Sequence, residues 1–123
     1  MGFGGAGPQR TRREKSREQG REKSRHQGGL CAIARIETLS GLEEEALALL
    51  ADMAFAVRAE EDACVSYAVT RVLGSPTHIA VHARFADWQA FKDHAETAHM
   101  DRLLPRLNPL LAAPIALEVF LEV

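Results

Sequence analysis

Two histidines stand five residues apart in the stretch FKDHAETAHM, at His94 and His99. An imidazole exchanges its proton near neutral pH, so either ring could act as a general base or as a metal ligand. On one ideal helix this spacing gives a net rotation of about 140°, so the rings would not share a face. Metal ligation favours a spacing of four residues. We therefore predict no metal site, with His94 as the base or orienting group and His99 as a helix-end residue bordering a pocket.

His94 could instead be a structural histidine that links its helix to the next segment, and this alternative remains open. Tyr67 is the other candidate for chemistry, because a buried phenol must find a hydrogen-bond partner. That partner could be a substrate oxygen or another group of the protein. Trp88, the only tryptophan, could pack in the core or form a pocket wall. The residues predicted to line the pocket are Ala83, Phe85, Trp88, Phe91 and His99.

Hydrophobic periodicity predicts the elements that must position these residues. Alternating and β-branched stretches indicate strands, and apolar residues at helical spacing indicate helices. Ser40 and Glu43 fit a capping box at the start of the first helix. Three prolines after residue 99 predict short, kinked helical turns there. The predicted order is strand 31–38, helix 41–59, strand 64–71, strand 77–85, a helix from residue 88, kinked turns over 99–112 and strand 115–123.

This order, β-α-β-β-α-β, is that of the α+β ferredoxin-like fold, an antiparallel sheet with both helices on one face. Along residues 64–71 the apolar side would carry Val65 and Tyr67. The helix-free face would carry Phe120 and, from residues 77–85, His78, His82 and Arg84. A second copy could cover this mixed surface. We therefore predict a homodimer that packs sheet against sheet.

Charge divides the chain into two parts. Residues 1–29 hold eight Lys/Arg and three Asp/Glu, a formal charge of +5, and include the near-repeats REKSREQG and REKSRHQG. We interpret them as a disordered basic tail. This tail could be dispensable, could bind nucleic acid or a membrane surface weakly, or could lie upstream of the true translation start. Residues 30–123 hold seven Lys/Arg and fourteen Asp/Glu, a charge of −7. An acidic domain argues against nucleic acid as a partner.

Cysteine spacing and hydropathy bound the environment. Cys31 and Cys64 form no CxxC or zinc-ligand pattern, which is typical of reduced thiols in a cytoplasmic protein. No apolar run approaches the length of a membrane span. We therefore expect a cytoplasmic protein without membrane segments.

Two motifs carry a family resemblance. Residues 61–67 (EDACVSY) resemble the Glu-Pro-Gly-Cys-x-x-Tyr entry to the second strand of the antibiotic biosynthesis monooxygenase family. Residues 85–94 (FADWQAFKDH), followed by residues 97–99 (TAH), resemble that family's third-strand exit and its helix ending in His-x4-His. The resemblance covers residues 31–123 and implies a homodimeric α+β barrel. It also implies oxidation of an aromatic or quinol substrate by O₂ without metal, haem or flavin.

The chain departs from the family pattern at three places. Ala83 and Phe85 stand where members commonly carry Glu and Trp, which counts against any mechanism that uses that carboxylate. Asp62-Ala63 replaces the Pro-Gly pair. A haem-degrading branch carries a Trp and a His where this chain has His94 and Leu104, so the resemblance does not predict haem chemistry.

Cofactor-free oxygenation requires a base, a donor to the substrate oxyanion and a dry aromatic pocket. We assign His94 as the base and Tyr67 as the donor. The predicted function is a cofactor-independent monooxygenase acting on an aromatic or quinol-type small molecule. The alternative is a non-catalytic small-molecule binder or a stress-associated dimer of the same fold. Nothing in the sequence identifies the substrate.

Overall fold

The computed structural model describes residues 29–123, so the predicted basic tail lies outside the described residues apart from Gly29. The fold is α+β, with the β-α-β-β-α-β order that the sequence predicts, except that the second helical region consists of two α-helices and a 3₁₀ turn. The elements are β1 Leu30–Glu37, α2 Glu43–Glu60, β2 Cys64–Arg71, β3 His78–Phe85, α3 Trp88–Ala95, α4 Ala98–Leu107, η1 Asn108–Leu110 and β4 Ala116–Leu121.

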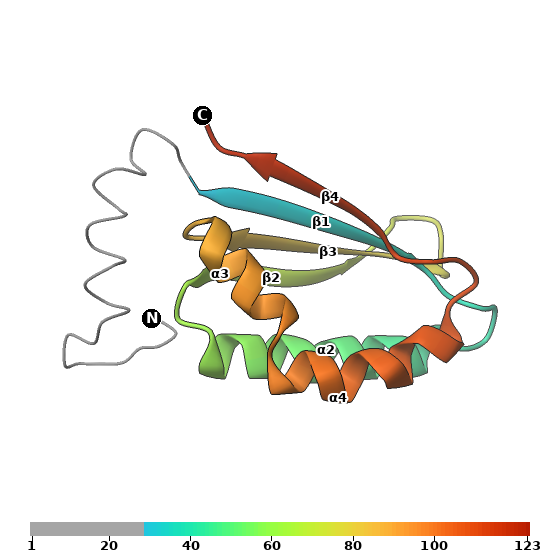
Figure 1. Cartoon of the computed structure of the whole chain (residues 1–123). Coiled ribbons are helices and arrows are strands. Elements are labelled where there is room, and N and C mark those ends of the chain that lie inside the picture. The colour runs from blue at the N-terminus through green and yellow to red at the C-terminus, as the bar shows by residue number, and fades with distance from the viewer. Residues whose placement is uncertain (1–28) are drawn as a thin grey trace.

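The four strands form one antiparallel sheet in the order β2-β3-β1-β4. Helices α2 and α4 lie side by side against one face of this sheet, and α3 lies over the end of β3 (Figure 1). The predicted ferredoxin-like arrangement with its helices on one face is therefore confirmed. No helix among the described residues is long and apolar enough to cross a membrane.

The first helix begins two residues later than predicted, and the predicted capping box is wrong. Leu42 is the N-cap residue, and no side chain caps the helix there. Glu43 Oε1 instead accepts a hydrogen bond from the backbone N–H of Gly41 at 2.8 Å. Gly41 has a φ of +89°, a left-handed conformation that glycine adopts without steric cost. This turn takes Ser40 out of register with the helix.

The second helical region also differs from the prediction, because it breaks before its prolines. Helix α3 ends at Ala95, and Thr97 starts α4 by accepting a hydrogen bond from the N–H of Met100 at 3.3 Å. Pro105 lies inside α4 and does not interrupt it. A threonine cap thus sets the break, since its oxygen satisfies an otherwise unpaired amide of the new helix.

The core lies between the sheet and the helices. Strand β3 alternates as predicted: Ile79, Val81, Ala83 and Phe85 are buried, and the residues between them face away. Strand β2 does not alternate along its whole length. A bulge between Cys64 and Ser66 shifts its register and leaves Val65 59% exposed, so the prediction of Val65 on the apolar side was wrong. The residues of α2, α4 and η1 in the main core cluster are Ala46, Leu49, Leu50, Met53, Val57, Leu103, Leu107 and Leu110.

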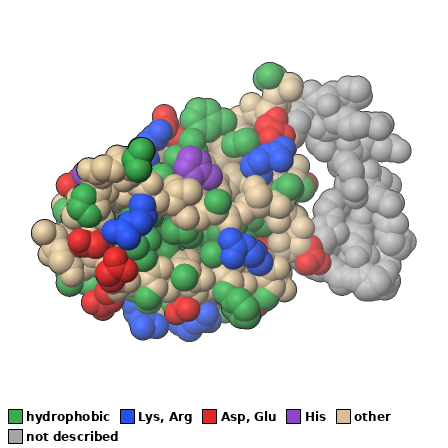
Figure 2. Space-filling model, turned by 180° about the vertical axis from the view of Figure 1, so that it is seen from behind, with side chains coloured by type: hydrophobic (Ala, Val, Ile, Leu, Met, Phe, Trp, Pro, Cys, Tyr) green, Lys and Arg blue, Asp and Glu red, His purple; other side chains and the backbone are tan. Residues whose placement is uncertain are grey.

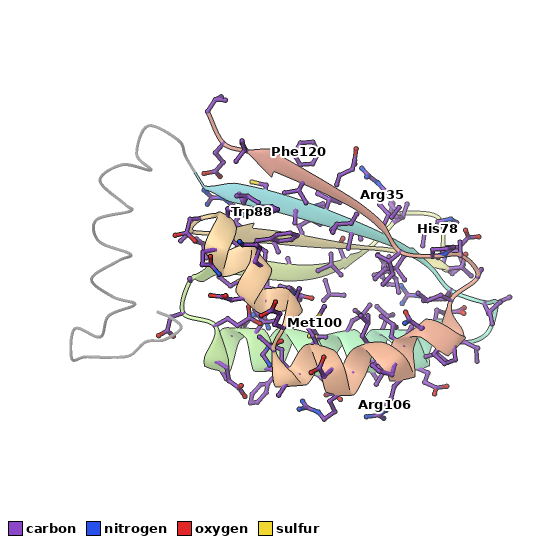
Figure 3. All side chains as sticks on the ribbon, viewed as in Figure 1. Arg35, His78, Trp88, Met100, Arg106 and Phe120 are labelled. Atoms are coloured by element: carbon purple, nitrogen blue, oxygen red, sulfur yellow. The ribbon has the colours of Figure 1, made fainter. Side chains whose placement is uncertain are left out.

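The other face of the sheet is covered by none of the described helices. Arg35 on β1 and Phe120 on β4 point away from α2 and α4 (Figure 3). His78, His82 and Arg84 are exposed on this face, as predicted. Seen from behind, the surface mixes hydrophobic side chains with charged ones (Figure 2). Cys31 and Cys64 are both free thiols.

Candidate active site

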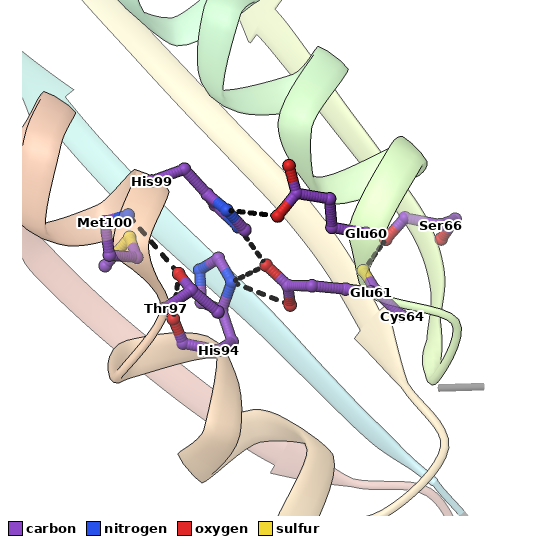
Figure 4. Close-up of polar contacts among 8 residues, drawn as sticks. All are labelled: Glu60, Glu61, Cys64, Ser66, His94, Thr97, His99 and Met100. Atoms are coloured by element: carbon purple, nitrogen blue, oxygen red, sulfur yellow. Dashed lines mark hydrogen bonds and ion pairs between the residues drawn. The ribbon is translucent and has the colours of Figure 1, made fainter. Parts of the chain in front are cut away.

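Both histidines of FKDHAETAHM bind the same carboxylate. Nδ1 of His94 lies 3.0 Å from Oε1 and 2.9 Å from Oε2 of Glu61, and Nε2 of His99 lies 2.5 Å from Oε2 (Figure 4). Only 7% of the Glu61 side chain, 11% of the His94 side chain and 2% of the His99 side chain are exposed. The three residues therefore form a buried Glu–His–His cluster.

Three element ends bring this cluster together. Glu61 is the C-cap residue of α2, His94 lies in the last turn of α3, and His99 lies in the first turn of α4. The predicted rotation of about 140° assumed one continuous helix. That assumption was wrong, because the chain turns between α3 and α4. The break lets two rings that would diverge on one helix converge on Glu61.

Charge on Glu61 is favoured by the histidines against two opposing effects. Burial by itself raises the pKa of this carboxyl, and the hydrogen bond and charge of His94, followed by those of His99, outweigh it and lower the pKa. The C-terminal end of α2 also disfavours a negative charge. An ionised carboxylate can only accept hydrogen bonds, so both facing ring nitrogens carry protons.

A cavity of about 310 Å³ lies beside the cluster, between the sheet and the helices. This volume is at the lower end of the range for small-molecule sites. Tyr67 and His94 bring the only hydroxyl and ring nitrogens to a lining that is otherwise apolar. The remaining lining residues are Ala32, Ala34, Ile36, Leu50, Met53, Val81, Ala83, Phe85, Phe91, Ala95, Met100, Leu104, Leu107, Ile115 and Leu117.

The His94 ring lies between two aromatic rings of the cavity wall, with centroids 5.9 Å from Tyr67 and 5.4 Å from Phe85. Neither His94 Nε2 nor Tyr67 Oη bonds to another described residue. His99 Nδ1 is the one fully buried side-chain nitrogen or oxygen without a hydrogen-bond partner in the described part of the chain. His94 Nε2 and Tyr67 Oη are therefore accessible and have no hydrogen-bond partner among the described residues.

Tyr67 remains a phenol at neutral pH. Burial, followed by the nearby Cys64 and Glu61, raises its pKa above its ordinary value. A protonated phenol is a hydrogen-bond donor to a substrate oxygen and not a base. Burial also raises the pKa of the neighbouring Cys64 thiol to about 12, which makes this thiol a poor nucleophile.

Three of the five predicted pocket residues line the cavity, namely Ala83, Phe85 and Phe91. His99 does not, because it lies behind Glu61 and is enclosed. Trp88 does not line it either and is 53% exposed. Its ring packs on Phe91 at 5.5 Å, with Lys92 Nζ 5.9 Å from its centroid. Trp88 therefore neither packs in the core nor forms a wall of the cavity, the two alternatives that the sequence left open.

Sequence reasoning missed Glu61 as a site residue, although it opens the EDACVSY motif. A signal was present: Glu60, Glu61 and Asp62 place three carboxylates at the end of α2, where the helix dipole disfavours them. An acid at such a position needs a cationic or donor partner. The cavity residues from α4 onward, among them Met100, Ile115 and Leu117, were also missed.

Glu61, His94 and His99 also offer atoms of the kind that ligate metals, all within 4.8 Å of one another. Because an ionised Glu61 only accepts hydrogen bonds, we assign each facing nitrogen as a donor to it at these distances. A cation would have to replace both protons. The geometry fits a hydrogen-bonded cluster without further adjustment.

Comparison with known proteins places this fold among relatives. Rv0793 from Mycobacterium tuberculosis is 24% identical, with a TM-score of 0.72 over 78% of this chain and 96% of its own. PA3566 from Pseudomonas aeruginosa is 21% identical, with a TM-score of 0.71 over 78% and 95%. A structure described as an antibiotic biosynthesis monooxygenase is 22% identical, with a TM-score of 0.71 over 76% and 98%. These similarities show a shared fold.

No curated protein sequence matches the chain. The sequence model of one family, antibiotic biosynthesis monooxygenase, matches residues 29–105. This range includes all three residues of the Glu–His–His cluster and most of the cavity lining. The chain belongs to the antibiotic biosynthesis monooxygenase family.

Proposed function

We propose that this protein is a monooxygenase that oxidises an aromatic or quinol-type small molecule with O₂, without a cofactor. The observation that carries the proposal is the apolar cavity in which an accessible imidazole and an accessible phenol are the polar groups. Apolar walls accept an aromatic ring, and the two polar groups orient its oxygen. Family membership supports the same class of reaction.

In the proposed mechanism, His94 is the base and Tyr67 is the donor. Nε2 of His94 takes the proton of a phenolic O–H, which leaves an electron-rich phenolate. The Tyr67 hydroxyl donates a hydrogen bond to the phenolate oxygen. The apolar wall excludes water and so strengthens both interactions. Ala83, where relatives commonly carry a carboxylate, contributes only space, so the proton transfer falls to His94.

The overall reaction balances without another reductant. The phenolate gives electrons to O₂, and a bond forms between a ring carbon and oxygen. The O–O bond then breaks, one oxygen stays on the ring, and the other leaves as water. A hydroquinone and O₂ would thus yield a hydroxylated quinone and water, the four electrons coming from the substrate.

The proposed assembly is a homodimer through the helix-free face of the sheet. Phe120 is 45% exposed on this face, which also carries the exposed Arg35 and His82. A second copy would bury this mixed surface. Sedimentation or light scattering should give a dimer at micromolar concentration, and Phe120→Glu should yield monomers. A wild-type monomer under these conditions would rule out the dimer.

Oxygen uptake by metal-free protein tests the proposed reaction. A panel of hydroquinones and anthrone-type phenols should include substrates that raise uptake above the protein-free rate. Ala83→Val narrows the cavity and should raise the KM, because Ala83 is a lining residue. Ala51→Val is the matched control, since it makes the same change at an exposed position of α2 that does not line the cavity.

Two results would count against the enzyme. Uptake equal to background across the whole panel would leave a non-catalytic binder, provided that ligands still protect the protein against unfolding. Equal KM values for Ala83→Val and Ala51→Val would place the reaction outside this cavity.

A further inference from the structure

Glu61 is a buried carboxylate in an unfavourable place. It is 7% exposed and lies at the negative end of α2. Burial alone would favour its neutral form. It nevertheless receives hydrogen bonds from two histidines that reach it from α3 and α4. A leucine or methionine there would avoid the desolvation cost, so the carboxylate calls for an explanation beyond packing.

The hydrogen bond to Glu61 determines which nitrogen of His94 carries the proton. A neutral imidazole has one N–H and one lone pair. Because Nδ1 faces the carboxylate at 2.9 Å, Nδ1 holds the proton and Nε2 holds the lone pair. Nε2 lies on the side of the ring away from Glu61 (Figure 4) and is accessible. The tautomer fixed by Glu61 is therefore the one that a base at the cavity requires.

We propose that Glu61 is a positioning residue that holds His94 in its Nδ1–H tautomer and stabilises the imidazolium formed when Nε2 takes the substrate proton. This inference rests on the proposed function for its catalytic consequence. The tautomer itself is a property of the protein without substrate. A carboxylate behind an imidazole both orients the ring and offsets the positive charge that proton transfer creates.

His99 completes this arrangement from the enclosed side. Its Nε2–H donates to Glu61 Oε2 at 2.5 Å, and its other nitrogen lies 3.7 Å from the exposed Glu60. The ring is 2% exposed and is not part of the cavity wall. His99 therefore acts on Glu61 and not on the substrate. With two donors fixed to it, the carboxylate keeps its charge and its orientation.

Nitrogen-15 NMR of histidine-labelled full-length protein tests the tautomer directly. In its neutral form, His94 of the wild type should show a protonated Nδ1 and an unprotonated Nε2. Glu61→Gln should give a mixture of tautomers or the opposite one, because an amide both accepts and donates. Glu96→Gln is the matched control: it makes the same change between the two histidines, at an exposed residue, and should retain the wild-type spectrum.

Steady-state oxygen uptake supplies the second readout. Glu61→Gln should lower kcat about 10- to 100-fold, the size of loss typical when a carboxylate partner of a functional histidine is removed. The KM should change little, because Glu61 does not line the cavity. Glu61→Asp, which keeps the charge, should recover part of kcat. Glu96→Gln should match wild type.

The two readouts separate the two proposals. A neutral wild-type His94 with its proton on Nε2 overturns the positioning role, whatever the activity, and this test uses the wild-type protein alone. The predicted tautomer together with no oxygen uptake on any substrate confirms the positioning and rejects the proposed reaction. A third result would also overturn the positioning role. If stoichiometric Zn²⁺ or Fe²⁺ removes both N–H signals that face Glu61 and raises oxygen uptake, then the cluster is a metal site.

Discussion

The two sides of the Glu61 carboxylate differ in what lies behind each histidine. On the cavity side, His94 has an accessible Nε2 between aromatic walls. On the enclosed side, His99 has a fully buried Nδ1 without a hydrogen-bond partner. The two rings are chemically identical and bind the same carboxylate. Their roles differ because only one of them presents its second nitrogen to a space that a ligand can enter.

This difference teaches that a histidine's hydrogen bond to a carboxylate does not by itself indicate catalysis. In our proposal, the same contact orients a base on one side and satisfies a buried charge on the other. Activity should therefore depend most on His94, and stability most on His99. The opposite result, in which activity depends most on His99 and stability most on His94, would contradict this comparison.

The largest expected effect is that of His94→Asn on activity. The amide nitrogen of Asn replaces Nδ1 as donor to Glu61, and the basic Nε2 is lost. We expect kcat to fall about 100-fold or more, the contribution typical of a general base. Thermal unfolding should stay close to that of wild type, because the contact with Glu61 remains. A large loss of stability with wild-type turnover per folded molecule would contradict this assignment.

Substitution of His99 should show the opposite pattern. His99→Leu removes a donor from a buried carboxylate and should lower the free energy of unfolding by about 1–3 kcal/mol. His99→Gln places an amide N–H where Nε2 was and should recover most of this loss. Urea denaturation measures both values. Equal stability of the Leu and Gln variants would show that the hydrogen bond to Glu61 contributes little.

Acid should weaken the cluster in a defined direction. The pKa of Glu61 in the folded protein lies below its ordinary value of 4.5, so the unfolded chain binds the proton more tightly. The stability that the ionised carboxylate contributes is complete above that value and is lost as pH falls through the lower, folded pKa. The free-energy difference between wild type and Glu61→Gln should therefore shrink in acid. A difference that grows in acid would reverse the sign of the linkage.

Tyr67→Phe should have the smallest effect of these changes. Its hydroxyl makes no hydrogen bond to the described residues, so its removal should cost little stability. If it donates to the substrate, the KM should rise about two- to tenfold, equivalent to one neutral hydrogen bond. Isothermal titration with a substrate analogue checks the same loss. Reduced stability with an unchanged KM would assign the hydroxyl to the protein instead.

The fold was predictable where one face of an element is buried. The alternation of Ile79, Val81 and Phe85 identified both β3 and its buried side, because helices cover only that face. Strand β4 is an edge strand whose residues are exposed on both sides, so its apolar alternation overstated its burial. The bulge at Val65 left no clear signal in the residues around it.

The site was predictable only in part, because its contacts are long-range. Glu61 lies 33 residues from His94 and 38 residues from His99, and no local pattern records their meeting. The break between α3 and α4 depends on the Thr97 cap, which competes with an otherwise continuous helical pattern. His94 and Tyr67, which both line the cavity, were predicted because both combine reactive groups with an apolar neighbourhood in sequence.

The central claim is that the cavity beside His94 directs one oxygen atom of O₂ into an aromatic substrate. Turnover under ¹⁸O₂ tests it most directly, with mass spectrometry of the product from wild type and His94→Asn. We predict one labelled oxygen per product molecule, one O₂ consumed for each, and almost no labelled product from the variant. Product without the label, or hydrogen peroxide formed in the same amount as the O₂ consumed, would contradict the claim.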